Sequence, residues 1–168
     1  MKKNTDKIKQ NGISLKYYII VCATLVMLAA IRYGFFVITK CQGNSMYPTI
    51  RNGATLVGIK AFYSIDRNDL IVADPEEING TVIKRVVGIE GDHIEIKDGK
   101  LYINGEIDTQ FPNAQYIDET LDVIVPKDSY FLMGDNRDQS EDSRVFGAIT
   151  DDEIRYKVIY YSKEITSP

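Results

Sequence analysis

The stretch "GNSMYPTI", residues 43–50, contains a serine whose setting could support nucleophilic chemistry. Ser45 lies between Gly43 and Pro48, in a turn-like segment that closely follows a hydrophobic run. A serine in such a turn often only bonds to nearby backbone through its hydroxyl. A catalytic role requires a base close by, because a neutral hydroxyl is a weak nucleophile toward an amide.

Two side chains are candidates for that base. His93 is the only histidine, but it begins an alternating strand pattern, where a histidine without a catalytic role is common. Lys84 lies inside the apolar stretch "GTVIKRVVGIEGD", residues 80–92. Burial can lower a lysine pKa by several units, and Ser-Lys pairs are an established variant of the catalytic triad. The alternative is that Lys84 or Arg85 faces solvent or pairs with a carboxylate. Because neighbouring side chains on a strand point to opposite faces, we expect different roles for these two residues.

A third polar segment, "GDNRDQSEDSR" at residues 134–144, holds four acidic residues, two arginines and two serines directly after an apolar strand. A solvated surface loop has a similar composition. If the segment instead packs beneath an active site, Asp142 and Arg144 could form an ion pair. That pair could hold Ser140 where its hydroxyl orients a lysine amine, as supporting groups do around a catalytic base.

Residues 17–39 form a continuous apolar run with no acidic residue and one charge, Arg32. This length is sufficient to cross a hydrocarbon core about 30 Å thick, and Arg32 could extend to the interface. Five lysines within residues 1–16 predict a cytoplasmic N-terminus, which leaves residues 41–168 outside. A cleavable signal peptide with a site near residues 28–30 and a buried helix are the alternatives. We expect an uncleaved anchor, because the run is longer than an ordinary signal-peptide core.

The remainder of the chain predicts a mainly β domain, because short β-type runs follow one another between turn residues. The predicted strands are residues 54–59, 69–74, 81–89, 93–97, 100–105, 121–125, 130–134 and 156–162. Asp98-Gly99 is typical of a two-residue hairpin turn, and the spacing of Thr150 and Glu153 predicts a capped helical turn. Residues 108–120 are expected to form a polar loop.

Composition excludes several classes of function. Residues 41–168 carry 13 basic and 23 acidic side chains, which argues against a nucleic acid partner. With two cysteines and one histidine, the chain lacks the ligands for a zinc site or a disulfide framework. We therefore expect no metal, and the chemistry of a serine and a lysine needs no cofactor.

Taken together, the three polar segments resemble motifs of the type I signal peptidase family. "GNSMYPT" looks like the serine motif of that family, "KRVVGIEGD" its lysine motif and "GDNRDQSEDSR" its C-terminal motif, in the same order and after one N-terminal span. "RNDLIVAD" resembles a further strand motif, although Asn68 stands where a glycine is common. A lysine at the base position, one span and a short interval from Ser45 to Lys84 resemble the compact Gram-positive form.

The resemblance implies a role for each of these residues. Ser45 would be the nucleophile and Lys84 the general base, with Ser140 positioning the lysine amine. Asp142 and Arg144 would form a structural ion pair, and Arg85 would be a structural neighbour of the base. Gly43 would allow close approach of the substrate, but it cannot supply the side-chain hydroxyl that some members use to stabilise the oxyanion. We further expect Met46 and Tyr47 to contact lipid or substrate.

The resulting hypothesis is a membrane-anchored serine endopeptidase that removes signal peptides from exported preproteins through an acyl-enzyme. Its predicted parts are a cytoplasmic tail (1–16), a transmembrane anchor (17–39) and an extracytoplasmic catalytic domain (41–168), with preproteins and the lipid bilayer as partners. One alternative is a non-catalytic membrane-anchored chaperone or assembly factor, for example in pilus assembly. A self-cleaving repressor of the Ser-Lys type is a second, but the apolar span and the acidic body do not fit it.

Overall fold

The computed structural model describes residues 15–111, 114, 116 and 120–163. Its first element is helix α1 (Leu15–Phe35), the one helix in the described part of the chain that is long and apolar enough to cross a membrane. At 1.5 Å per residue its 21 residues span roughly 30 Å, the thickness of a hydrocarbon core. The predicted tail, residues 1–16, lies outside the described residues except for its last two, which begin α1.

The C-terminal end of the predicted span is wrong, because residues 36–40 are not helical. They form strand β1 (Phe36–Lys40), which pairs antiparallel with β2 (Thr55–Ile59). Aromatic and β-branched residues fill β1 and favour an extended backbone. Apolar character alone does not separate the end of a membrane helix from a strand that follows it directly.

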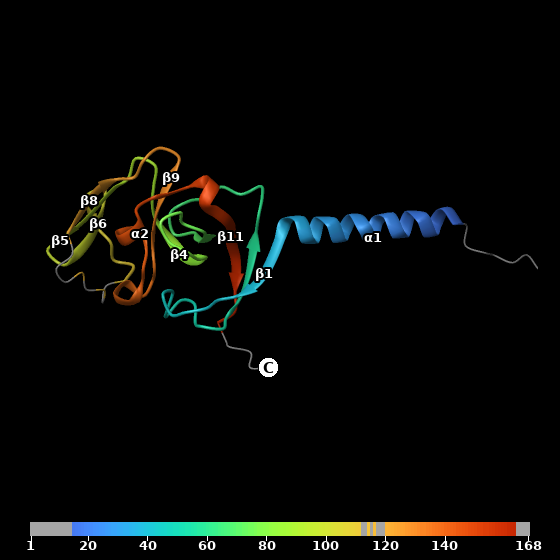
Figure 1. Ribbon diagram of the computed structural model, residues 1–168, viewed down its shortest axis with the longest axis horizontal. Coiled ribbons are helices and arrows are strands. Elements are labelled where there is room, and N and C mark those ends of the chain that lie inside the picture. The colour runs from blue at the N-terminus through green and yellow to red at the C-terminus, as the bar shows by residue number, and fades with distance from the viewer. Residues whose placement is uncertain (1–14, 112–113, 115, 117–119, 164–168) are drawn as a thin grey trace, which may run out of the picture. The chain divides into compact units, whose positions relative to one another are not determined.

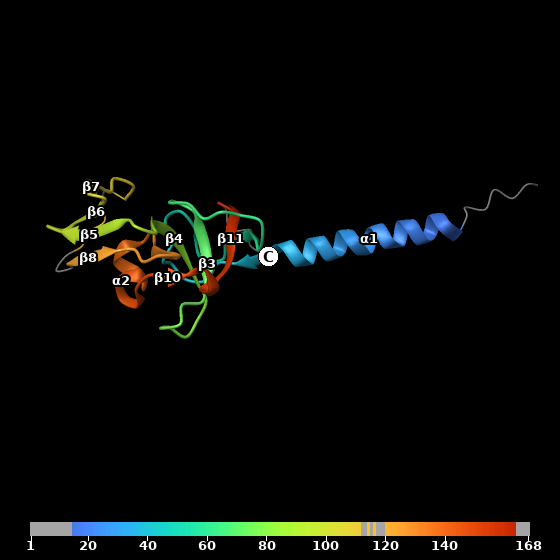
Figure 2. The same ribbon diagram turned by 90° about the horizontal axis from the view of Figure 1, so that it is seen from above.

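The described residues from 35 onward form a compact unit of their own, and the described residues up to 34 form a second unit. The larger unit is built from two antiparallel sheets. The first sheet contains, in spatial order, β1, β2, β11 (Ile154–Tyr161), β3 (Leu70–Ala73), β4 (Val82–Ile89), β9 (Ser129–Met133) and β10 (Ile149–Thr150). The second sheet contains β7 (Glu106–Ile107), β6 (Lys100–Ile103), β5 (His93–Lys97) and β8 (Leu121–Ile124). Figures 1 and 2 both place β5, β6 and β8 at one end of this domain and β11 at the other, with β4 between them.

The mainly β prediction is confirmed, and each predicted strand overlaps an observed one. The predicted hairpin is present as β5 and β6, with Asp98 and Gly99 at positive φ angles of 52° and 70°. The predicted helical turn is the 3-10 helix η2 (Asp151–Glu153). Its cap is formed by Thr150, whose backbone N–H donates to the Glu153 carboxylate over 2.7 Å.

Residues 108–120 were expected to form a polar loop, but some of their side chains make apolar and ring contacts. Residues 112, 113, 115 and 117–119 lie outside the described residues. Among the described residues of this loop, Tyr116 is buried in the core between the sheets. Phe111 lies under the guanidinium of Arg137, with Cζ 4.7 Å from the ring centroid. Two short helices follow β9, namely η1 (Arg137–Gln139) and α2 (Ser143–Phe146).

Candidate active site

Ser45 lies in a turn between β1 and β2, where its side chain is half-buried. The turn is closed by a hydrogen bond from Tyr47 N–H to the Asn44 carbonyl, 3.0 Å long. Gly43 has a φ angle of 91°, and no atom lies within 4 Å of the position that a Cβ would take. Glycine is therefore required here for its left-handed conformation, whereas the space around it is open to an approaching chain.

The turn that carries Ser45 is fastened to the segment that follows β9. The Asn136 N–H donates to the Ser45 carbonyl over 2.9 Å, and Asn136 Nδ2 donates to the Asn44 carbonyl over 3.1 Å. Sequence reasoning did not single out Asn136. The sequence feature that could have identified Asn136 is its position in Gly-Asp-Asn directly after a strand, because a chain can turn there and contact a neighbouring loop.

Lys84 projects from β4 into a cavity of about 350 Å³ that Ser45 also lines. The Lys84 side chain is 3% exposed, and it forms no hydrogen bond or ion pair with any other described residue. Burial lowers the pKa of Lys84, because the charged ammonium loses its hydration. The Asp142 carboxylate opposes this shift of the pKa, and the Arg144 guanidinium adds to it.

Other residues that sequence reasoning did not single out also line this cavity. They include Cys41, which follows β1, and Tyr156 on β11. Burial raises the pKa of the Cys41 thiol, so this group stays protonated at neutral pH. His93, the other candidate base, lies on β5 in the second sheet and bonds to Asp122 at 2.7 Å, and it is not among the residues that line the cavity.

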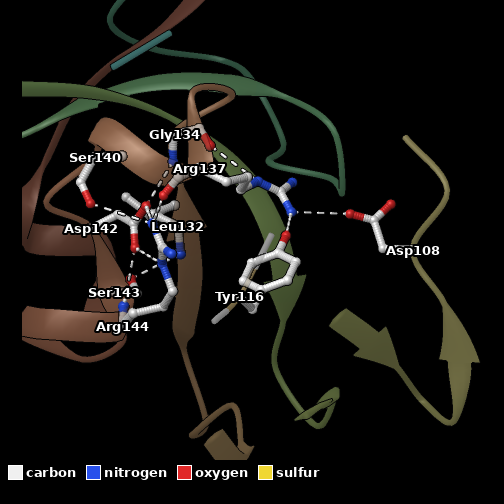
Figure 3. Close-up of polar contacts among 9 residues, drawn as sticks. All are labelled: Asp108, Tyr116, Leu132, Gly134, Arg137, Ser140, Asp142, Ser143 and Arg144. Carbon is white, nitrogen blue, oxygen red and sulfur yellow. Dashed lines mark hydrogen bonds and ion pairs between the residues drawn. The ribbon is translucent and has the colours of Figure 1, made fainter. Parts of the chain in front are cut away.

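The Ser140 hydroxyl is buried and has no hydrogen-bond partner among the described residues. Ser140 lies against Gly134: a Cβ built on that glycine would lie 2.2 Å from Ser140 Oγ and 2.6 Å from the Ser45 carbonyl oxygen. Ser140, Gly134 and the backbone of Ser45 therefore meet at one point. Figure 3 shows Ser140 and Gly134 above the Asp142 and Arg144 side chains.

Asp142 and Arg144 form the ion pair that the sequence suggested. Arg144 Nε lies 2.8 Å from Asp142 Oδ1, and an Nη2 hydrogen bond of 2.9 Å reaches Oδ2 (Figure 3). Asp142 Oδ2 also accepts the Gly134 N–H at 3.0 Å, and Arg144 Nη2 donates to the Ser140 carbonyl at 3.3 Å. The pair thus fixes Gly134, which lies against the Ser140 hydroxyl, and the backbone of Ser140 itself.

Arg85 lies on the strand face opposite Lys84, as alternation requires, but neither residue is exposed. Arg85 donates from Nε and Nη2 to the two carboxylate oxygens of Asp135, at 2.8 and 2.6 Å. A third bond of 2.8 Å reaches the carbonyl of Asn68. Asn68 has a φ angle of 75°, a left-handed conformation that asparagine tolerates and that glycine adopts without steric cost.

Met46 and Tyr47 differ in their surroundings. Met46 is 1% exposed and packs in the core beneath β2 and β11, so the expectation of a lipid or substrate contact is wrong for this side chain. Met46 and Tyr47 point in different directions from the turn, and the apolar Met46 side chain takes the buried position. Tyr47 is exposed.

Comparison with known proteins gives a consistent result. The family model described as "Signal peptidase, peptidase S26" matches residues 14–161. Signal peptidase IB of Staphylococcus aureus (strain COL) is 30% identical over 171 residues, covering 87% of each chain. Signal peptidase I S of Bacillus subtilis (strain 168) is 32% identical over 159 residues, covering 86% of this chain and 84% of the relative. The crystal structure of a signal peptidase I from Enterococcus faecalis V583 superposes with a TM-score of 0.50 at 26% identity, covering 60% of this chain and all of that one.

Proposed function

Because this chain belongs to the signal peptidase family, peptidase S26, we propose that it removes N-terminal signal peptides from exported preproteins, with Ser45 as nucleophile and Lys84 as general base. The observation that carries the assignment is the buried Lys84 amine, which shares a cavity with Ser45 and has no partner among the described residues. A lysine in that setting can be neutral and can accept a proton. A non-catalytic chaperone with this fold would not need such a costly buried amine.

The reaction follows from these positions. The Lys84 amine takes the proton of Ser45 as Oγ attacks the scissile carbonyl, and the ammonium then gives a proton to the leaving amine as the C–N bond breaks. The product is an ester between Ser45 and the signal peptide, which water hydrolyses with Lys84 again as the base. The Ser140 hydroxyl, which has no partner among the described residues, is available to orient the lysine amine, and the Ser45 N–H stabilises the oxyanion. Gly43 offers no hydroxyl for this purpose, and none of the steps requires a metal or a cofactor.

The substrate is expected to bind as an added strand. β1 is an edge strand of its sheet, and β4 pairs with β9 only from Arg85 onward. Residues 39–42 and 81–84 both line the cavity, so an extended peptide bound there could bond to backbone of either segment. Alternate side chains of such a peptide point the same way. The first and third residues before the cut would therefore face the apolar lining, which includes Leu56 and Val72, and would have to be small.

The decisive assay is cleavage of a preprotein by the detergent-solubilised enzyme, with the new N-terminus mapped by mass spectrometry. We expect Ser45→Ala and Lys84→Arg to fold, as judged by circular dichroism, and to be inactive. Arginine keeps the positive charge but cannot act as a base, because its pKa exceeds about 12. Substantial turnover by a well-folded Lys84→Arg enzyme would contradict the role of Lys84, since an ion-pair role is preserved by arginine.

Substrate choice is tested with a matched pair of preproteins. One carries alanine at the first and third positions before the cut, and the other differs only by phenylalanine at the first position. We expect cleavage of the alanine form only. Equal cleavage of both would remove the requirement for small side chains.

The orientation proposed for the chain places residues 1–16 in the cytoplasm and residues 41–168 outside. It is supported by the five lysines within residues 1–16. A protease added to intact spheroplasts should digest the catalytic domain and spare the N-terminal tail. Protection of residues 41–168 in sealed cells would reverse this topology.

A further inference from the structure

A second cavity adjoins the turn that carries Ser45, and the reaction described above does not use it. This cavity holds about 380 Å³ and is lined by Tyr47 and Pro48, whereas Ser45 itself lines the first cavity, which it shares with Lys84. Asn136, which bonds to the backbone of the turn, also lines the second cavity. The two cavities therefore meet the same turn, one at the nucleophile and one directly after it in the chain.

Tyr47 is the residue of this turn that the fold leaves unexplained. Its neighbour Met46 is buried in the core, and the fully buried Ile50 donates its N–H to the Met46 carbonyl over 2.8 Å. These contacts fix the backbone of residues 46–50, yet the Tyr47 side chain is 50% exposed. A tyrosine ring offers a large apolar surface for recognition. Tyr47 is thus presented, at a fixed place beside the reacting serine, to any chain that lies there.

Another part of the lining is a ring that is held rigidly. The Phe111 centroid lies 4.7 Å from Arg137 Cζ and 5.8 Å from Arg85 Cζ. Each arginine is fixed in turn by a carboxylate, Arg137 by Asp108 at 3.2 Å and Arg85 by Asp135 at 2.6 Å. Figure 3 shows the Arg137 side chain extended toward Asp108. Because the ring is ordered beforehand, a ligand that packs on it loses little affinity to the ordering of side chains.

The chemistry of the lining favours an apolar ligand group. Rings and aliphatic groups come from Tyr47, Pro48, Phe111 and Ala114. Two charged members of the lining, Asp135 and Arg137, are neutralised by their ion pairs, and the remaining charge in the described lining is the exposed Asp138. Pockets of this size with mostly apolar walls and a few polar groups are typical of small binding sites.

The geometry of an extended chain selects the substrate residue that reaches this cavity. Alternate side chains point to the same side, and in the proposed complex the third and first residues before the cut face the first cavity. The next side chain on that side belongs to the second residue after the cut, whose Cα lies about 7 Å further along the chain. Tyr47 is two residues after Ser45, and two residues also span at most about 7 Å. The second cavity therefore begins within reach of that side chain.

We propose that the second cavity binds the side chain of the second residue after the cut and prefers an apolar side chain there. The proposal rests on the proposed function, because it extends the path of the same substrate beyond Ser45 into the chain that is released. Tyr47 is thereby a specificity-determining residue and takes no part in the proton transfers.

The preference is tested with two short soluble peptides that differ only at the second position after the cut. One carries leucine there, and the other carries asparagine, which has a similar shape but a polar side chain. We expect kcat/KM of the wild type to be several-fold higher for the leucine peptide, because an apolar pocket leaves a polar group unpaired. In Tyr47→Ala the ratio of the two kcat/KM values should fall toward one.

Tyr160→Ala is the matched control. Tyr160 is 60% exposed, lies on β11 and lines neither cavity, so its replacement should keep the wild-type ratio. A wild-type ratio near one would overturn the proposal. A ratio that Tyr47→Ala leaves unchanged, or that both variants lower equally, would do the same.

A binding measurement tests the contact without catalysis. The chain contains no tryptophan, so Tyr47→Trp in a Ser45→Ala background reports the environment of position 47 alone. Binding of the uncleaved leucine peptide is measured separately by isothermal titration calorimetry. We expect bound peptide to shift the emission to the blue and to reduce quenching by acrylamide, with no change for Tyr160→Trp in the same background. Bound peptide that leaves the Tyr47→Trp emission unchanged would contradict the proposal.

These measurements separate failure of this proposal from failure of the proposed function. Cleavage of both peptides at equal rates would retain the proposed function and refute the preference of the second cavity. If Ser45 were not the nucleophile, Ser45→Ala would cleave both peptides, and the ratio measured for the wild type and Tyr47→Ala would still report on the second cavity.

Discussion

Gly134 is the position where the candidate site is most sensitive to a single added methyl group. In Gly134→Ala the new Cβ would lie 2.6 Å from the Ser45 carbonyl oxygen, 2.6 Å from Ser140 Cβ and 2.2 Å from Ser140 Oγ. A close carbon-to-oxygen contact is about 3.4 Å. The Ser140 hydroxyl can rotate away, but the Ser45 carbonyl belongs to the backbone and accepts the Asn136 N–H. The serine turn must therefore move.

The required movement sets the size of the effect. Relief of the contact with the Ser45 carbonyl displaces the nucleophile by about 0.8 Å, from the difference between the contact of 2.6 Å and the ordinary separation of about 3.4 Å. A misplacement of about 1 Å can lower the rate of a reaction roughly 100-fold. We expect kcat/KM of Gly134→Ala to fall about 10- to 100-fold, and overpacking to lower the free energy of unfolding by about 1–3 kcal/mol.

Gly88→Ala is the matched control, because it overpacks a glycine in the core without touching the site. Its Cβ would lie 2.8 Å from Ile94 Cδ1 and 3.0 Å from Val125 Cγ2, which belong to the core between the sheets. Cleavage of a soluble peptide is measured for both variants, together with urea unfolding. Gly88→Ala should lose stability and keep its activity per folded molecule. Wild-type activity in Gly134→Ala, or an equal loss of activity in Gly88→Ala, would refute the positioning argument.

Three further outcomes concern the two charged neighbours on β4. Activity should rise as pH increases through the lowered pKa of Lys84, because only the neutral amine accepts the Ser45 proton, and a rising limb near the ordinary lysine value of about 10.4 would contradict this. Lys84→Met should be inactive but melt at a higher temperature than wild type at pH 7. Below about pH 10.4 the unfolded state binds the lysine proton more strongly than the folded state, so the buried lysine lowers the stability of the wild-type protein there. Thermal melts of both proteins at a series of pH values measure this effect. Arg85→Ala leaves the buried Asp135 carboxylate unpaired and should lower the free energy of unfolding by about 3–5 kcal/mol in urea, whereas a loss below about 1 kcal/mol would mean that the pair is unimportant.

The parts of the fold that the sequence predicted are those set by local physics. The β5–β6 hairpin follows from a turn that needs positive φ angles at Asp98 and Gly99. The η2 turn follows from a reciprocal cap between Thr150 and Glu153. In both cases residues within a few positions of each other satisfy their own backbone, so the pattern does not depend on the rest of the chain.

The features that the sequence did not predict depend on contacts between distant segments. The burial of Arg85 requires Asp135, which lies 50 residues later in the chain. The position of Ser45 depends on Asn136, and the burial of Met46 on a core assembled from β2, β3, β4 and β11. β1 was hidden inside an apolar run because a membrane helix and an edge strand use the same residue types.

The Asp142–Arg144 pair has an electrostatic effect as well as a structural one. Asp142 is needed in this place because its carboxylate anchors the Gly134 N–H, yet that carboxylate also raises the pKa of Lys84. The Arg144 guanidinium lowers the pKa of Lys84 and offsets that effect. Burial remains the largest influence on the pKa of Lys84, ahead of either charge of the pair. The same ion pair that orders the segment after β9 therefore also limits how far the Asp142 carboxylate raises the pKa of Lys84.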